Sequence, residues 1–95
     1  MNLDEFVRAT NSLNPTLILL VAKGQHFEPV TQISLIESTI FLQTKADSPS
    51  INSTLNLNQF IKMLKKVPNS YDIRFFNTKK LVFGFRIIDK TLVFY

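Results

Sequence analysis

The sequence predicts an α+β fold in which one αβββ unit is duplicated, with two helices packed on one side of an antiparallel sheet. Three observations predict it. The chain has 95 residues, 45% of them hydrophobic, which suits a single domain with one modest core. A pattern of seven residues near the start returns 54 positions later. After each copy of this pattern, apolar residues change from helical spacing to the alternation typical of strands.

The repeat can be followed through most of the chain. Asn2–Arg8 recurs as Asn56–Lys62, and Ile33–Leu42 matches Phe85–Phe94 at an offset of 52 residues. Duplication of one unit explains both matches. The alternative is that any two amphipathic modules of the same class resemble each other.

The repeat predicts two units, residues 2–44 and 56–95, joined by a polar linker at residues 45–55. A unit of about 40 residues rarely folds alone. We therefore expect both units to share one core in a single domain covering residues 1–95.

Each unit is predicted to begin with a helix, because apolar residues recur at the spacing of one helix face. The two stripes are Leu3, Phe6, Val7, Thr10 and Leu13, and Leu57, Phe60, Ile61, Leu64 and Val67. Asn2 and Asn56 are N-caps, each with an acid or amide three residues later, in a capping-box pattern. Each helix is expected to end before a proline, Pro15 or Pro68.

Three strands are predicted after each helix, and the last two form a hairpin with a two-residue turn, at Glu37-Ser38 and at Asp89-Lys90. The side chains expected on the core face of these hairpins are Ile33, Leu35, Ile40 and Leu42, and Phe83, Phe85, Ile87, Leu92 and Phe94. Ile73 and Phe75 reach that face only if the loop around Thr78-Lys79-Lys80 has an odd number of residues.

The strand Leu17–Val21 is apolar on both faces. This pattern indicates either a strand that is buried on both sides or one face of a self-association surface.

The formal net charge of +4 is unevenly distributed, because residues 1–47 sum to −2 and residues 48–95 to +6. Basic and aromatic side chains alternate on the predicted outer face of the second unit. These candidate surface residues are Arg74, Phe76, Lys79, Lys80, Arg86, Lys90 and Tyr95, and Ile88 and Val93 are expected beside them. Such a face suits single-stranded nucleic acid, which stacks its bases on rings and its phosphates near cations. Alternatively, the other unit or a second subunit covers the apolar side chains and the charges form a rim.

Lys62, Lys65 and Lys66 are expected on the solvent side of the second helix near its C-terminal end, where they suit the helix dipole. A phosphate contact is the alternative for the same lysines.

The sequence contains few candidates for catalytic residues. The chain has no cysteine and one histidine, His26, in a predicted loop with Glu28 nearby. No nucleophile is paired with a base, and the two glycines, Gly24 and Gly84, do not form a phosphate-binding loop. We therefore expect no enzyme activity, no cofactor and no metal. An acidic N-terminus and the lack of a long apolar run favour a cytoplasmic protein without a membrane contact.

The order helix–strand–strand–strand–helix across residues 2–67 is also that of the double-stranded RNA-binding domain. That family has a lysine-rich cluster at the start of its last helix, where this chain has Asn56–Gln59. The repeat explains the same order more economically.

A capped helix, a terminal proline and a following strand, as in Leu57–Pro68, resemble small uncharacterised proteins of Gram-positive bacteria and their phages. The resemblance implies an origin in a phage or an accessory gene, and no activity. We expect a small non-enzymatic interaction protein that binds an unknown protein partner or itself, as a homodimer. The alternative is a nucleic-acid-binding accessory protein that uses the basic aromatic face.

Overall fold

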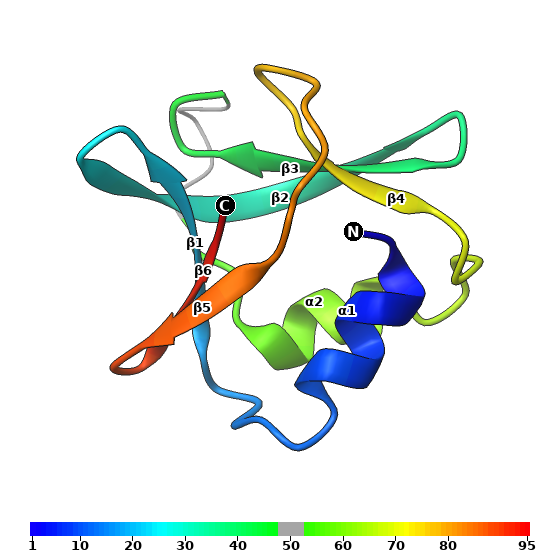
Figure 1. The fold of residues 1–95 in the computed structure, drawn as a ribbon, viewed down its shortest axis with the longest axis horizontal. Coiled ribbons are helices and arrows are strands. Elements are labelled where there is room, and N and C mark those ends of the chain that lie inside the picture. The colour runs from blue at the N-terminus through cyan, green and yellow to red at the C-terminus, as the bar shows by residue number, and fades with distance from the viewer. Residues whose placement is uncertain (48–52) are drawn as a thin grey trace.

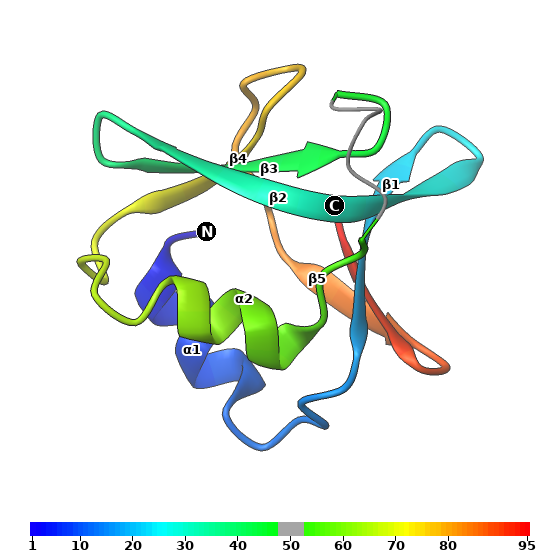
Figure 2. The same ribbon diagram turned by 180° about the vertical axis from the view of Figure 1, so that it is seen from behind.

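The structure is a computed structural model that describes residues 1–47 and 53–95. Its helices and strands follow in the order α1 (Leu3–Thr10), β1 (Ile18–Lys23), β2 (His26–Ile36), β3 (Thr39–Thr44), α2 (Leu57–Met63), β4 (Asp72–Phe75), β5 (Phe85–Ile88) and β6 (Thr91–Phe94). Both helices lie side by side on the same side of the sheet (Figures 1 and 2). The α+β class and the order of the elements are as predicted.

The sheet is mixed, and the prediction of an antiparallel sheet is wrong. Its six strands are ordered β4-β3-β2-β1-β6-β5. The neighbours β1 and β6 are parallel, as are β3 and β4, whereas the other pairs are antiparallel. Each parallel pair joins the first strand of one unit to the last strand of the other. Pairing between strands of different units depends on how the units dock. The alternation of apolar and polar residues within one strand does not indicate this docking.

The residues between β4 and β5 also pair with β4. The two edges of the sheet, at β4 and at β5, are therefore joined by this segment. Phe75 N–H donates to the Lys80 carbonyl at 2.9 Å, and Val82 N–H donates to the Ile73 carbonyl at 2.9 Å. Residues 80–88 therefore run from β4 to β6, as β2 runs from β1 to β3. In Figure 1 this segment is the orange chain that descends from the top of the picture into the β5 arrow.

Both helices begin at the predicted caps. The Asn2 side chain accepts from Glu5 N–H at 2.9 Å, and the Asn56 side chain accepts from Gln59 N–H at 2.8 Å. The Glu5 and Gln59 side chains accept from the backbone N–H of the respective cap, which completes both capping boxes. The helices end at Thr10 and Met63, several residues before the prolines.

The core lies between the helix pair and the sheet, and three phenylalanine rings form its centre. Phe6 and Phe60, one from each helix, have ring centroids 5.3 Å apart. Phe94 on β6 lies 5.5 Å from Phe6 and 5.9 Å from Phe60. All three side chains are fully buried. Both units therefore contribute to one core.

Hydrogen bonds between the units occur in matched pairs. Leu3 N–H donates to Tyr71 O at 2.9 Å, and the residues 54 positions away repeat this bond, since Leu57 N–H donates to Leu17 O at 2.8 Å. Likewise, Asp4 N–H donates to Asn69 O at 3.0 Å, and Asn58 N–H donates to Pro15 O at 2.9 Å. The start of each helix is thus bonded to the segment that precedes the first strand of the other unit.

The hairpin pairing is as predicted, with Leu35 opposite Ile40 and Ile87 opposite Leu92. The predicted burial is only partly right, since Leu35 and Ile87 are 50% and 44% exposed. Both lie next to the turns, where the hairpins extend beyond the core. Val93, expected on the outer face, is buried.

The predicted position of Phe83 in the core is wrong, and so is the odd-numbered loop before it. Ile73 is bonded to Val82 and Phe75 to Lys80. The loop between Phe75 and Lys80 therefore has four residues, an even number. Phe83 N–H and Gly84 N–H both donate to Tyr95 O, so the strand bulges by one residue at this point. The bulge returns Phe85 to the core side. The equivalent shift in the first unit lies between Val30 and Gln32. A bulge changes which residues face the core, as an odd loop would.

The strand β1 is central, between β2 and β6, and Leu19 and Val21 are buried whereas Ile18 is 36% exposed. It is therefore fully buried on one face only. Much of the predicted linker, residues 48–52, lies outside the described residues. At the ends of that range, Asp47 accepts from Thr44 N–H, and Leu55 N–H donates to Val30 O.

Candidate interaction surface

The most exposed large apolar side chain of the described residues is Phe83, at 85%. Leu81, two residues earlier, is 38% exposed, and Tyr95 at the end of the chain is 45% exposed. Together with Arg86 they form what we call the Phe83 surface. Scattered exposed apolar residues are normal, but an aromatic pair beside an arginine matches the composition of protein interfaces.

Phe83 is presented by a hydrogen-bonded backbone rather than by a free loop. Its N–H donates to Tyr95 O at 2.9 Å. Gly84 and Tyr95 then exchange two backbone bonds, at 3.3 and 3.1 Å. Because the backbone is hydrogen-bonded at Phe83 and at both neighbouring residues, Val82 and Gly84, the point from which the side chain projects into solvent is well defined.

Gly84 allows Tyr95 to lie close to the backbone. A Cβ atom at position 84 would be 3.2 Å from Tyr95 Oη, which is tighter than ordinary van der Waals contact. On the same face, the guanidinium carbon of Arg86 is 5.0 Å from the centre of the Tyr95 ring, in a cation–π contact. The small residue and the arginine therefore fix the orientation of this ring.

The first unit lacks such a surface. Thr31, the residue 52 positions before Phe83, is only 5% exposed. Its hydroxyl is buried, without a hydrogen-bond partner among the residues that the structure describes. Leu55 N–H donates to the adjacent Val30 O, which brings the chain before α2 next to this position. The Phe83 surface is thus specific to the second unit.

A second group of predicted residues gathers where β4 ends. Lys79 Nζ lies 4.0 Å from the ring centre of Phe76 and 4.9 Å from that of Phe41. Arg74 donates from Nη1 to the Lys79 carbonyl at 3.0 Å and lies 3.8 Å from Asp72. The lysine therefore covers the two rings.

Five of the seven predicted residues thus fall into two groups. Arg86 and Tyr95 belong to the Phe83 surface, and Arg74, Phe76 and Lys79 to the second group. The two groups adjoin, because Leu81 forms a backbone bridge with Arg74. Lys80, at the start of the segment 80–88, and Lys90, in the turn after it, are exposed.

The sequence interpretation missed Phe83, Leu81 and Phe41. Alternation placed Phe83 in the core because the bulge was not recognised. A glycine inside an apolar strand pattern, here Gly84, is the signal that could have revealed it.

The sites considered for chemistry stay dispersed. His26 Nε2 lies 3.3 Å from Glu28 Oε1, and the histidine side chain is 68% exposed. Among residues 1–47 and 53–95, no three His, Asp or Glu side chains come together as metal ligands. Neither α1 nor α2 is long and apolar enough to cross a lipid bilayer.

Comparison with known proteins finds no match to this chain among protein families, curated proteins or solved structures.

Proposed function

We propose that this chain is a non-enzymatic interaction protein of the cytoplasm that binds another protein through the Phe83 surface. The observation that carries the proposal is a phenylalanine 85% exposed on a backbone that is hydrogen-bonded on both sides. Leaving an apolar ring in water forgoes about 1.5–3 kcal/mol of burial free energy. A partner that covers the ring recovers this free energy, and the backbone that carries the ring is already hydrogen-bonded and need not be ordered on binding.

The neighbours of Phe83 suit such a contact. Residues that dominate binding energy at interfaces are enriched in tyrosine, tryptophan and arginine and lie near the centre of a contact. Tyr95 and Arg86 flank Phe83 and are already oriented by their own stacking contact. Leu81 extends the apolar area along the same segment.

The test compares three forms of the protein in affinity purification from its host cells, followed by binding measurements with the purified partner. The forms are wild type, Phe83→Ser and Phe27→Ser. Phe27 is a matched control because it is a phenylalanine on β2 that is 49% exposed. Phe83→Ser is expected to weaken binding at least tenfold, whereas Phe27→Ser leaves the affinity within twofold. Equal effects of the two substitutions would contradict the proposal.

Binding of single-stranded nucleic acid is the second candidate. Two observations favour it: the stacked pair Arg86 and Tyr95, and the net charge of +6 in residues 48–95. Fluorescence anisotropy with labelled single-stranded DNA, single-stranded RNA and duplexes decides it. This candidate requires micromolar binding to single strands that weakens steeply with salt, because neutralised phosphates release counterions. No binding at low salt would rule out nucleic-acid binding as the function.

We also propose that the chain arose as a duplication of one αβββ unit. The matched hydrogen bonds between the units and the bulges at equivalent positions support this origin. In this view, the Phe83 surface is a later specialisation of one unit, since its counterpart around Thr31 is buried.

A further inference from the structure

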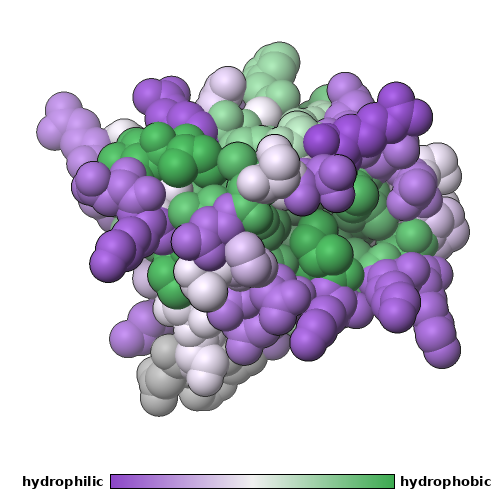
Figure 3. Space-filling model, turned by 90° about the horizontal axis from the view of Figure 1, so that it is seen from below, coloured by the Kyte–Doolittle hydropathy of each residue, from purple (hydrophilic) through white to green (hydrophobic). Residues whose placement is uncertain are grey.

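The outer face of the helix pair carries a second, independent surface. Two pockets, of about 190 and 290 Å³, lie between α1 and α2. Val7 and Ile61 line both of them, so the pockets adjoin along one groove. The view from the helix side in Figure 3 has hydrophobic side chains framed by hydrophilic ones.

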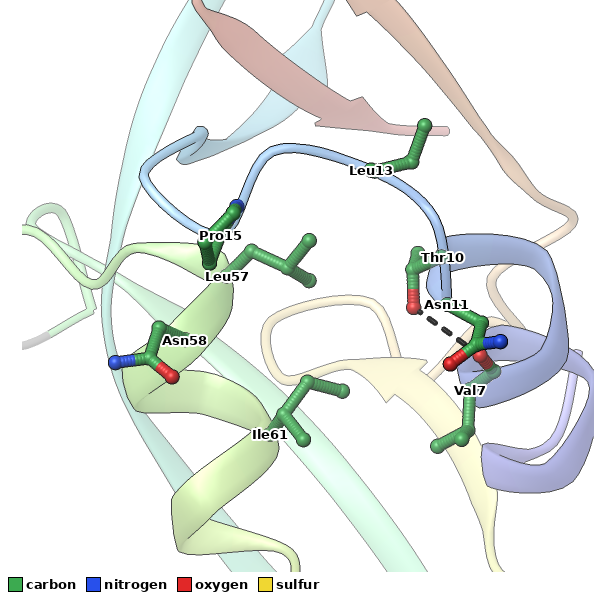
Figure 4. A pocket seen from close by; sticks show the side chains of 8 residues that line it. All are labelled: Val7, Thr10, Asn11, Leu13, Pro15, Leu57, Asn58 and Ile61. Carbon is green, nitrogen blue, oxygen red and sulfur yellow. Dashed lines mark hydrogen bonds between the residues drawn. The ribbon is translucent and has the colours of Figure 1, made fainter.

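The first pocket has apolar walls and a neutral rim. Leu57, Ile61 and Val7 face it from the two helices, with Leu13 beyond the end of α1, as Figure 4 shows. The polar groups at this end are uncharged, and Thr10 is occupied because its hydroxyl donates to Phe6 O at 2.8 Å.

The second pocket is equivalent in its walls and different in its rim. Leu3 and Leu64 stand where the first pocket has Leu57 and Thr10. Lys62 and Lys65 line its edge. Among the described residues neither lysine forms an ion pair. Both acids on α1 have partners of their own, since Asp4 is paired with Arg8 at 3.1 Å and Glu5 accepts from Asn2 N–H at 3.0 Å.

We infer that this groove binds an amphipathic α-helix of another protein, with two apolar side chains in the pockets and carboxylates facing Lys62 and Lys65. Charge complementarity selects an acidic partner. A helix is selected because both walls are helices whose backbone groups are bonded internally, so they cannot pair with an extended segment. A helix satisfies its own backbone and presents apolar side chains at i, i+3, i+4 and i+7.

The test uses two capped 14-residue synthetic peptides. Both carry leucines at i, i+3, i+4, i+7 and i+11, and the remaining positions are all glutamate in one and all lysine in the other. Binding is measured by fluorescence anisotropy at low micromolar protein. The glutamate peptide is expected to bind at least tenfold more tightly than the lysine peptide.

Variants connect this binding to the groove. The double substitution Lys62→Glu, Lys65→Glu is expected to weaken the glutamate peptide at least tenfold and to strengthen the lysine peptide. A charge-matched control, Lys80→Glu with Lys90→Glu, is expected to change both affinities less than threefold. Ile61→Asp should abolish binding of either peptide while circular dichroism reports a folded chain. Phe83→Ser leaves peptide binding unchanged, which separates this inference from the proposed function.

Three results would overturn the inference. They are no binding of the glutamate peptide, equal binding of both peptides, and binding that is insensitive to the Lys62 and Lys65 substitutions. Sedimentation velocity adds a fourth. A wild-type dimer that Ile61→Asp dissociates would assign the groove to a second copy of this chain.

Discussion

At the scale of single residues, side chains of one type have very different roles in this chain. Phe60 is fully buried and contacts Phe6 and Phe94, whereas Phe83 is 85% exposed. The helical stripe of α2 predicts the burial of Phe60, whereas Phe83 lies on extended chain, where one extra residue in a bulge reverses the faces that follow. Phe60 packs in the core between the helix pair and the sheet, whereas the ring of Phe83 projects into solvent.

This contrast predicts opposite effects on stability. Phe60→Ala removes a ring from the centre of the core and is expected to cost about 3–5 kcal/mol of unfolding free energy. Phe83→Ala is expected to change it by less than about 0.5 kcal/mol, as is usual for surface substitutions. Urea unfolding followed by circular dichroism measures both. A large loss of stability in Phe83→Ala would mean that this ring contributes to the fold rather than to binding.

At the scale of elements, the two helices are too short to be stable by themselves. They have 8 and 7 residues, and isolated helices need about 12–15 residues even for good helix formers. Their stability therefore depends on the capping boxes, on the buried apolar stripes, and on bonds such as Leu3 N–H to Tyr71 O.

The caps give a test at this scale. Asn2→Ala and Asn56→Ala each remove a side-chain acceptor from a helix start, and each is expected to cost about 1 kcal/mol of unfolding free energy. Replacement by Asp is expected to retain most of the stability, since its carboxylate can accept the same bond. Thermal and urea unfolding provide the values. Equal stability of the Asn→Ala and wild-type proteins would show that the boxes contribute little.

The elements are also where the sequence was most informative. The stripes and caps predicted both helices, and the turns at Glu37-Ser38 and Asp89-Lys90 predicted the register of both hairpins. Glu37, Ser38 and Asp89 have positive φ, as tight hairpin turns require. These features depend on residues within a few positions of each other, so a single sequence contains them.

At the scale of the whole molecule, neither unit is complete without the other. β1 pairs with β6, and β3 pairs with β4, so each unit provides strand neighbours for the other. Phe6 of α1 packs on Phe60 of α2 and on Phe94 of β6. We therefore expect folding to be cooperative across the chain.

Separated halves test this expectation. Residues 1–47 and residues 53–95, produced as two peptides, are each expected to lack a cooperative thermal transition at low micromolar concentration, because a chain below about 40–50 residues rarely sustains a core. Mixing them is expected to restore the circular dichroism spectrum and a cooperative transition. A half that unfolds cooperatively by itself as a monomer would contradict a shared core.

The sequence by itself determined the α+β class, both capped helices, the two hairpins and their register, because each follows from local spacing and turn chemistry. Only the tertiary structure decided that β1 joins β6 and β3 joins β4 in parallel, since pairing between distant strands depends on how two apolar faces dock. It also decided that Leu35 and Ile87 lie beyond the core and that Phe83 faces solvent. Exposure is a property of what packs above a residue, and here that covering comes from segments far away in the chain.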